Sequence, residues 1–172
     1  MTHSSTDNFS NAIYIALGSN QGDSKKHLLE AKDFLTRLST HTPEFSKVYT
    51  TEPIGPSSTD FLNAVAKIES ELTPTELLKK LKDQERQQGR PSRYPKWTSR
   101  TLDLDIIDFK GYIESNNELS LPHPALQSRL FVLLPLSDIA PKWVHPVSQQ
   151  SIQALIERAE KMRIETSAWQ WE

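Results

Sequence analysis

Two aspartates set within one apolar run are the residues whose spacing most strongly suggests chemistry. Asp103 and Asp105 alternate with leucine and isoleucine through residues 102–106, and this alternation predicts a strand that carries both carboxylates on one face. Two carboxylates on one face repel each other and resist burial, so we expect a cation between them. An exposed edge strand is the simpler alternative, but this segment is among the most apolar in the chain.

The segment before this strand is rich in cations. Residues 86–100 contain five arginines and lysines and no acid. Guanidinium and ammonium groups bind phosphate oxygens, so a basic segment that leads into a carboxylate pair predicts a site for a metal-bound polyphosphate. A solvated basic loop is the alternative interpretation.

The composition limits the classes of protein to which the chain can belong. The chain has 172 residues, 36% of them hydrophobic, a net charge of -2 and no cysteine. This length is enough for one domain with a substantial core, and the lack of cysteine excludes a disulfide framework and favours a cytoplasmic setting. A slightly acidic chain is not expected to be a general nucleic-acid binder. No apolar run is long enough to cross a bilayer, so we expect no membrane partner.

The pattern of apolar residues predicts the elements that position these groups. Strands are expected at residues 12–17, 42–51, 61–72 and 100–109, and helices at about residues 24–38, 73–88, 125–138 and 151–161. We expect residues 12–161 to form a single domain, with a disordered tail at 1–11 and a C-terminal tail at 162–172.

The order of these elements predicts a ferredoxin-like α+β sandwich, a βαββαβ core with a mainly antiparallel sheet, helices on one face and a C-terminal helical appendix. If the apolar residues of the strands meet the helices, Asp103 and Asp105 point to the uncovered face of the sheet, and so do Phe61 and Asn63. An aromatic ring, an amide and two carboxylates would then share one open surface, which a ligand can use.

Six short motifs together resemble the family of 6-hydroxymethyl-7,8-dihydropterin pyrophosphokinases, which act in folate synthesis. They are Ile15–Asn20 (IALGSN), Thr51–Pro56 (TEPIGP), Asp60–Ala64 (DFLNA), Glu85–Arg90 (ERQQGR), Arg100–Ile106 (RTLDLDI) and Leu121–Pro124 (LPHP) with Arg129. They follow one another in family order, and RTLDLDI is highly specific. The resemblance implies the ferredoxin-like fold and transfer of a pyrophosphoryl group from ATP to the hydroxymethyl group of a reduced pterin, leaving AMP.

The resemblance also implies roles for individual residues. Asp103 and Asp105 would hold two Mg²⁺ ions, which prefer hard oxygen ligands, and Arg90 and Arg100 would join them as catalytic residues by stabilising charge on the phosphates. The residues expected to contact ATP are Glu85, Arg90, Lys96, Trp97, Arg100, Ile106, His123 and Arg129. Those expected to contact the pterin are Thr51, Pro53, Ile54, Phe61, Asn63 and Phe131.

Within these sets, the pterin would stack between Phe61 and Phe131, and Ile106 would give adenine an apolar contact. Three positions depart from the family pattern. Phe61 stands where tyrosine is common, and Ser92 and Lys96 stand where arginine is often found. These changes bear on the rate of the reaction and not on the metal pair.

Two other functions remain open on the residues alone. Another Mg²⁺-dependent phosphotransferase or nucleotidyltransferase would use the same carboxylate pair on a different acceptor, and it would bind ATP without a pterin. A ferredoxin-like module for RNA would use the basic segment, with an affinity that falls steeply with salt, and it would not need Asp103 or Asp105. For the pyrophosphokinase we expect a monomer in the cytoplasm, with association with other folate-pathway enzymes as a possibility.

Overall fold

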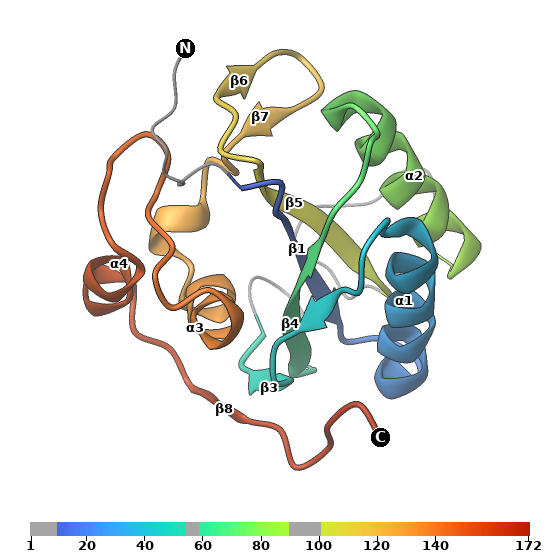
Figure 1. Cartoon of the computed structure of the whole chain (residues 1–172). Coiled ribbons are helices and arrows are strands. Elements are labelled where there is room, and N and C mark those ends of the chain that lie inside the picture. Colours follow the sequence, from blue (N-terminus) through green and yellow to red (C-terminus); the bar gives the residue numbers. More distant parts are fainter. Residues whose placement is uncertain (1–9, 54–58, 90–100) are drawn as a thin grey trace.

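Apolar strands from distant parts of the chain form one central antiparallel sheet (Figure 1). The computed structural model describes residues 10–53, 59–89 and 101–172, so the predicted tail at 1–11 lies almost wholly outside the described residues. The strand order is β5-β1-β4-β3-β8, and β2 also pairs with β4. The strands of this sheet are β1 (Ile13–Ser19), β2 (Glu44–Phe45), β3 (Tyr49–Thr51), β4 (Phe61–Ile68), β5 (Asp103–Phe109) and β8 (Ile164–Thr166).

The described residues also form helices and a small hairpin. The helices are α1 (Ser24–Leu38), α2 (Pro74–Gln87), α3 (Leu130–Ile139) and α4 (Ile152–Arg158), with a short 3-10 turn at Leu126–Ser128. The hairpin consists of β6 (Glu114–Ser115) and β7 (Ser120–Leu121). Within the described ranges, no helix combines the length and the apolar character that a membrane span needs.

The two helices of the core begin at side-chain caps. The Asp23 side chain accepts a hydrogen bond from the Lys26 amide at the start of α1. At the start of α2, Thr73 and Glu76 form a capping box in which each side chain accepts from the other's amide. Gly89 follows the end of α2 with a φ of 106°, a conformation that glycine adopts without strain.

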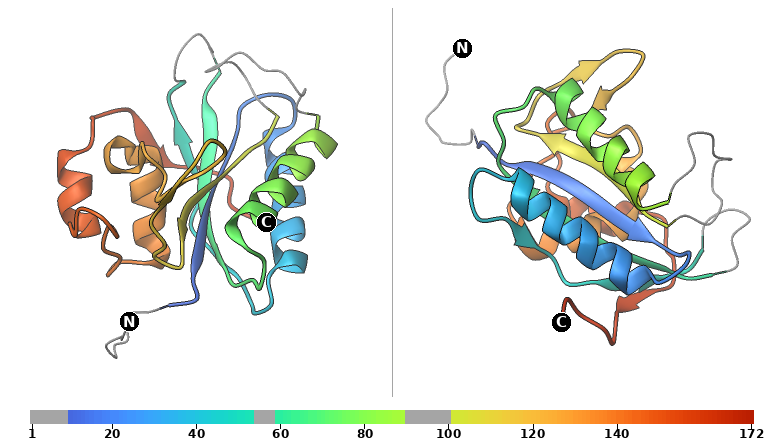
Figure 2. Two further views of the ribbon diagram at one scale, coloured as in Figure 1. Left: turned by 90° about the horizontal axis from the view of Figure 1, so that it is seen from above. Right: turned by 90° about the vertical axis from the view of Figure 1, so that its right-hand side faces the viewer.

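The helices α1 and α2 cover one face of the sheet and form the first core with it (Figure 2). Leu28 from α1 and Leu81 from α2 are fully buried there against Ile15 of β1 and Leu104 of β5. This arrangement confirms the prediction that the alternate apolar side chains of the strands pack against these two helices.

The expectation that the opposite face of the sheet is uncovered is wrong, because that face also carries helices. Figure 2 shows the sheet between α1 and α2 on one side and α3 and α4 on the other. Val65 of β4 and Ile107 of β5 are buried in a second core with Leu133 and Leu136 of α3. The physical reason is that this face of the sheet also carries apolar side chains, which are buried only if a second layer of helices packs on them.

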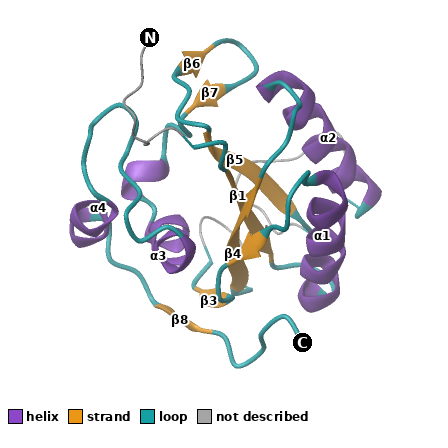
Figure 3. Cartoon of the chain, in the orientation of Figure 1, coloured by secondary structure: helices purple, strands orange, loops and turns teal. Residues whose placement is uncertain are grey.

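The C-terminal segment is not the tail that the sequence predicts. Residues 164–166 form β8, which pairs with β3 at the edge of the sheet (Figure 3). The Trp171 indole donates a hydrogen bond to the Ser46 carbonyl over 2.8 Å, and both Trp169 and Trp171 pack against the first core. Edge pairing and aromatic burial order this end of the chain.

Candidate functional site

The carboxylate pair lies at one end of the sheet beside a glycine. Gly18 of β1 pairs with Asp103 of β5 on one side and with Asn63 of β4 on the other. Directly opposite residues of antiparallel strands point to the same face, so these three positions form one row across the sheet. A Cβ atom at Gly18 would lie 2.8 Å from the Asn63 side-chain oxygen. The glycine therefore leaves the room between Asp103 and Asn63 that a side chain would fill.

The second aspartate lies one row further along the same face. Asp105 pairs with Ala16, which again presents only a small side chain between β5 and β4. Burial, together with the neighbouring Asp103 carboxylate, raises the pKa of Asp105 to about 7, and the cations Lys82 and Arg129 act in the opposite direction. The pair is thus an acidic site in which negative charge is unfavourable until a cation joins it.

The donor set of this site fits Mg²⁺. The described residues include no group of three or more His, Asp or Glu side chains that could hold a metal ion. Mg²⁺ does not need such a cage, because it keeps waters and binds through one or two carboxylates together with substrate phosphates. Asp103 and Asp105 would supply those two carboxylates.

Glu85 supports the strand that carries the pair. Its side chain is 2% exposed, and its Oε2 accepts a hydrogen bond of 2.6 Å from the amide of Leu104, which lies between the two aspartates. Because β5 lies at the edge of the sheet that the described residues form, no strand in this part of the chain pairs with the amide on its outer side. Lys82 Nζ lies 3.4 Å from the Glu85 Oε1, which brings a cation that we did not predict from the sequence close to the site.

His123 lies beside the same strand as a neutral hydrogen-bond donor. Its amide donates to the Ile107 carbonyl over 2.9 Å, and its Nδ1 accepts from the Ala125 amide over 3.1 Å. Burial and the nearby Arg129 guanidinium lower the pKa of His123 to about 4. With Nδ1 accepting, Nε2 holds the proton at neutral pH and can donate it in a hydrogen bond to an anionic ligand.

Arg129 and Phe131 reach the site from the start of α3. The Arg129 guanidinium carbon lies 5.6 Å from the centre of the Phe131 ring, a cation–π contact. The same charge acts on both Asp105 and His123. Arg129 thus connects the acidic site to an aromatic ring that is half-buried at the edge of the second core.

The predicted pterin residues of β3 and β4 also come together. Thr51 pairs with Phe61, and the Thr51 hydroxyl accepts a hydrogen bond of 2.7 Å from the Asn63 amide nitrogen. Phe61 is half-buried, and so is Pro53 just beyond the strand. The alternation of β4 places Phe61 and Asn63 on the face that carries Asp103.

Ile106 lies in the first core at the other face of β5. The residue is 3% exposed, because strand alternation turns its side chain with that of Leu104 toward α1 and α2. The apolar contact that we expect between Ile106 and adenine stays a prediction. The predicted residues Ile54, Arg90, Lys96, Trp97 and Arg100 lie outside the described residues.

The two ends of the basic segment nevertheless meet beside the carboxylate pair. An added Cβ atom at Gly89 would lie 3.6 Å from the Thr101 methyl group. The Ser19 hydroxyl at the end of β1 donates a hydrogen bond to the Thr101 carbonyl. Gly89 and Thr101 therefore lie side by side, and Thr101 is two residues from Asp103 in the sequence.

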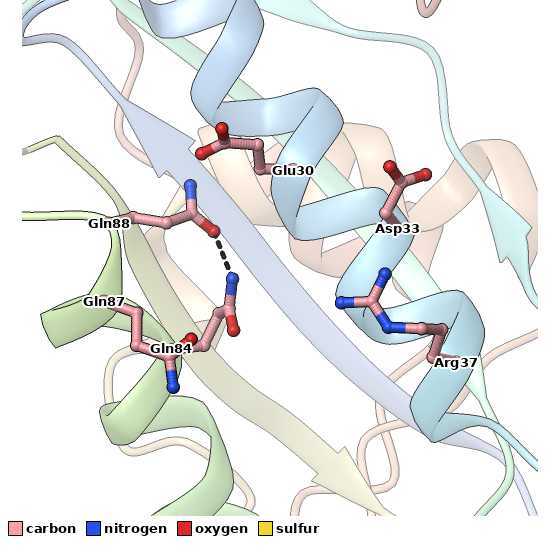
Figure 4. Close-up of a pocket in the computed structure, with 6 residues that line it drawn as sticks. All are labelled: Glu30, Asp33, Arg37, Gln84, Gln87 and Gln88. Carbon is pink, nitrogen blue, oxygen red and sulfur yellow. Dashed lines mark hydrogen bonds between the residues drawn. The ribbon is translucent and has the colours of Figure 1, made fainter.

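A separate hollow lies between α1 and α2 and contains none of the predicted site residues (Figure 4). It is lined by Glu30, Asp33, Arg37, Gln84, Gln87 and Gln88. At the end of α2, Gln84 donates a hydrogen bond to Gln88 over 2.7 Å, and the side chains that line the hollow carry charges of both signs. This hollow has neither the carboxylate pair nor the aromatic rings of the site on the sheet.

Known proteins resemble this chain over most of its length. The family model described as 7,8-dihydro-6-hydroxymethylpterin-pyrophosphokinase (HPPK) matches residues 14–141. The 2-amino-4-hydroxy-6-hydroxymethyldihydropteridine pyrophosphokinase of Haemophilus influenzae is 44% identical over 138 residues, which cover 79% of this chain and 86% of that protein. The Bacillus subtilis protein of the same name is 40% identical over 131 residues, covering 75% of this chain and 78% of that protein.

Solved structures share the fold at lower identity. A crystal structure of HPPK-DHPS in complex with substrates has a TM-score of 0.66 and 15% identity, covering 86% of this chain and 43% of that one. The wild-type HPPK-DHPS of Plasmodium falciparum has a TM-score of 0.62, again with 15% identity, and covers 86% of this chain. The present chain spans less than half of these longer proteins.

Proposed function

The chain belongs to the family of 7,8-dihydro-6-hydroxymethylpterin pyrophosphokinases, and we propose that it transfers a pyrophosphoryl group from ATP to the hydroxymethyl group of 6-hydroxymethyl-7,8-dihydropterin, leaving AMP. The observation that carries this proposal is the row of Asp103, Gly18 and Asn63 across the sheet. It brings a carboxylate pair for a metal-bound triphosphate within reach of the amide and ring expected to bind the pterin.

On the ATP side, the acidic site would hold Mg²⁺ through Asp103 and Asp105. Two bound Mg²⁺ ions would neutralise phosphate charge and lower the pKa of the acceptor hydroxyl. His123 would donate from Nε2 to a phosphate oxygen, and Arg129 would supply a charged fork. Glu85 would act indirectly, since its carboxylate already accepts from the Leu104 amide.

The basic segment would complete the ATP side. We assign phosphate contacts to Arg90, Lys96 and Arg100 and an ATP contact to Trp97, from their positions in the sequence motifs. The support from the described residues is that Gly89 and Thr101, which flank this segment, lie together. Arginine suits such contacts because it stays charged and binds two phosphate oxygens at once.

On the pterin side, Phe61 and Phe131 would stack on the flat ring system. Asn63 would hydrogen-bond its polar edge, with its amide oriented by Thr51. Pro53 and Ile54 would contribute the adjoining loop contacts. Proximity and orientation of the two substrates would then supply much of the rate enhancement.

We also place this activity in a single ferredoxin-like domain, supported by the β5-β1-β4-β3 strand order with two helical crossovers. The expected boundaries are 12–161, but the pairing of β8 with β3 extends this domain beyond residue 161. We propose a monomer acting in the cytoplasm. Association with another folate enzyme is supported by relatives that contain this unit within a longer chain. One example is the folic acid synthesis protein FOL1 of Dictyostelium discoideum, of which the match covers 20%.

The test is a product assay with ATP, 6-hydroxymethyl-7,8-dihydropterin and Mg²⁺, in which AMP and ADP are separated by chromatography. We expect AMP and a pterin diphosphate in equal amounts, and no product after Mg²⁺ is removed with EDTA. ADP in place of AMP would instead support the alternative of another phosphotransferase. Binding of a nonhydrolysable ATP analogue without any binding of the pterin would have the same meaning.

A further inference from the structure

The C-terminal strand reaches the two chain segments that meet at the pterin side of the site. β8 pairs with β3 so that Ile164 lies opposite Thr51, and Arg163 is the residue just before it. The Glu52 amide donates to the Arg163 carbonyl over 3.2 Å, and the Arg163 amide donates to the Glu52 carboxylate over 2.5 Å. The backbone of Arg163 is thus fixed to the residue that follows β3.

The side chain of Arg163 extends from there to the residue that precedes β4. Its Nη2 donates to Asp60 Oδ1 over 2.9 Å, and its Nη1 donates to Asp60 Oδ2 over 3.2 Å. This two-point geometry is the most directional form of an arginine–carboxylate pair. The guanidinium also holds the pKa of Asp60 below its usual range, so the pair is ionised at neutral pH.

These contacts close the end of the β3–β4 ladder. Thr51 and Phe61 are the last pair of that ladder, and Glu52 and Asp60 are the residues immediately beyond it. We propose that Arg163 is a positioning residue for the pterin, because it joins Glu52 to Asp60 and so holds the Thr51–Phe61 pair closed. This inference rests on the proposed function, since it concerns the ring and the amide expected to bind the pterin.

A general structural role explains these contacts less well. The side chains of Arg163 and Asp60 are 52% and 41% exposed, and exposed ion pairs contribute little to the free energy of unfolding. The C-terminal segment also has anchors of its own, because Gln170 bonds both the amide and the carbonyl of Val48. Loss of the guanidinium should therefore loosen the end of the ladder locally and leave β8 in place.

The experiment compares the full-length protein with Arg163→Ala, Asp60→Ala and the double variant. We expect each single variant to raise the KM for the pterin roughly three- to tenfold, because the Thr51–Phe61 pair is then held less firmly in the position that binds the pterin. The kcat and the KM for ATP should change less than twofold. The double variant should be no worse than either single one, because both remove the same interaction.

Two further variants separate positioning from a merely structural effect. Arg163→Lys, which retains the charge but not the fork, should restore part of the pterin KM. Arg158→Ala, which removes an exposed arginine from α4, is the matched control and should leave all constants unchanged. An unchanged pterin KM in Arg163→Ala, an equal rise in the KM for ATP, or additive effects in the double variant would overturn the proposal.

A second readout does not depend on the proposed reaction. In the ligand-free protein, hydrogen exchange of residues 59–63 should be faster in Arg163→Ala than in the wild type, with exchange in α1 unchanged. If the wild type fails to use the pterin, the proposed function is wrong, while this exchange measurement still decides whether Arg163 closes the ladder. Unchanged exchange in residues 59–63 would refute the closing role whatever the substrate.

Discussion

At the scale of single residues, Asp105 is in an environment that opposes its own negative charge. Burial and the neighbouring Asp103 raise its pKa to about 7, whereas an unperturbed aspartate titrates near 3.8. A folded protein with a raised carboxyl pKa binds more protons than the unfolded chain, so its stability falls as the pH rises between these two values. In the absence of a metal ion, the site therefore costs stability at neutral pH.

Replacing either aspartate with asparagine should separate stability from activity. We expect Asp103→Asn and Asp105→Asn each to lower kcat by roughly 100-fold or more, because a carboxylate proposed to hold Mg²⁺ is lost. In Mg²⁺-free buffer at pH 8, Asp105→Asn should melt at the same temperature as the wild type or higher, because the unfavourable charge is gone. Thermal melts and AMP formation measure the two effects.

Asp33→Asn is the matched control for this pair, because Asp33 is an exposed aspartate on α1. It should leave both the turnover and the melting temperature unchanged. Turnover close to that of the wild type in either Asp103→Asn or Asp105→Asn would contradict the metal-binding role.

The titration of His123 should change the stability with pH in the direction opposite to that of Asp105. Its pKa is lowered from 6.5 to about 4, so between these values the unfolded chain binds more protons and stability rises with pH. His123→Gln should therefore flatten the loss of stability between pH 7.5 and pH 5, measured by urea unfolding at both values. The same slope in the variant and the wild type would show that His123 is not the group responsible.

Sequence alternation could predict which residues share a face, but not which residues make room for them. Strand parity correctly groups Asp103 with Asn63, and the register of the sheet confirms this placement. The space at Gly18 depends on the pairing of three strands, and the approach of Lys82 depends on how α2 packs beside β5. Neither has a signal in a local pattern, because both arise from contacts between distant segments.

At the scale of elements, β5 is an edge strand that is held by a helix instead of another strand. The buried carboxylate of Glu85 accepts the hydrogen bond that the outer side of β5 offers at Leu104. Glu85→Ala would leave this buried amide unpaired and should lower the free energy of unfolding by about 1–3 kcal/mol. Glu85→Gln retains an acceptor and should lose less.

Urea unfolding measures the stability losses of Glu85→Ala and Glu85→Gln. Gln87→Ala is the control, because Gln87 is an exposed residue of the same helix. Equal losses in Glu85→Ala and Glu85→Gln would mean that the negative charge matters more than the accepted hydrogen bond. Because Leu104 lies between the two aspartates, Glu85→Ala should also raise the Mg²⁺ concentration required for half-maximal turnover.

The periodicity of apolar residues predicted the elements of the first core better than the layers around them. The capping residues of α1 and α2 and the spacing of their apolar residues are local signals, and both helices begin directly after the capping residues. The second layer was missed because Val65 and Ile107 are apolar on the opposite parity, so neither face of these strands is polar throughout. β8 has only three residues, too few for a period to be recognised.

At the scale of the whole molecule, the C-terminal segment connects the site to the first core. Its beginning joins Glu52 to Asp60 through Arg163, and its end packs against β2 and α1. The Trp171 ring lies 5.4 Å from the Phe45 ring and 5.5 Å from the Lys32 ammonium group. One segment thus has two contact regions, of which one borders the proposed pterin site and the other borders the core.

Substitutions in these two regions should have different consequences, one for stability and the other for the pterin KM. Trp171→Ala removes aromatic packing and the hydrogen bond to the Ser46 carbonyl, and it should lower the free energy of unfolding by about 2–4 kcal/mol. Trp171→Phe retains most of the packing and should lose about 1 kcal/mol. The pterin KM should remain within twofold of the wild type in both variants, since Gln170 and the β3–β8 pairing still hold the strand.

A pterin KM that rises in step with the loss of stability across Trp171→Ala, Trp171→Phe and Arg163→Ala would show that the segment acts as one unit. Independent changes would show that stability and substrate positioning are carried by different ends of it.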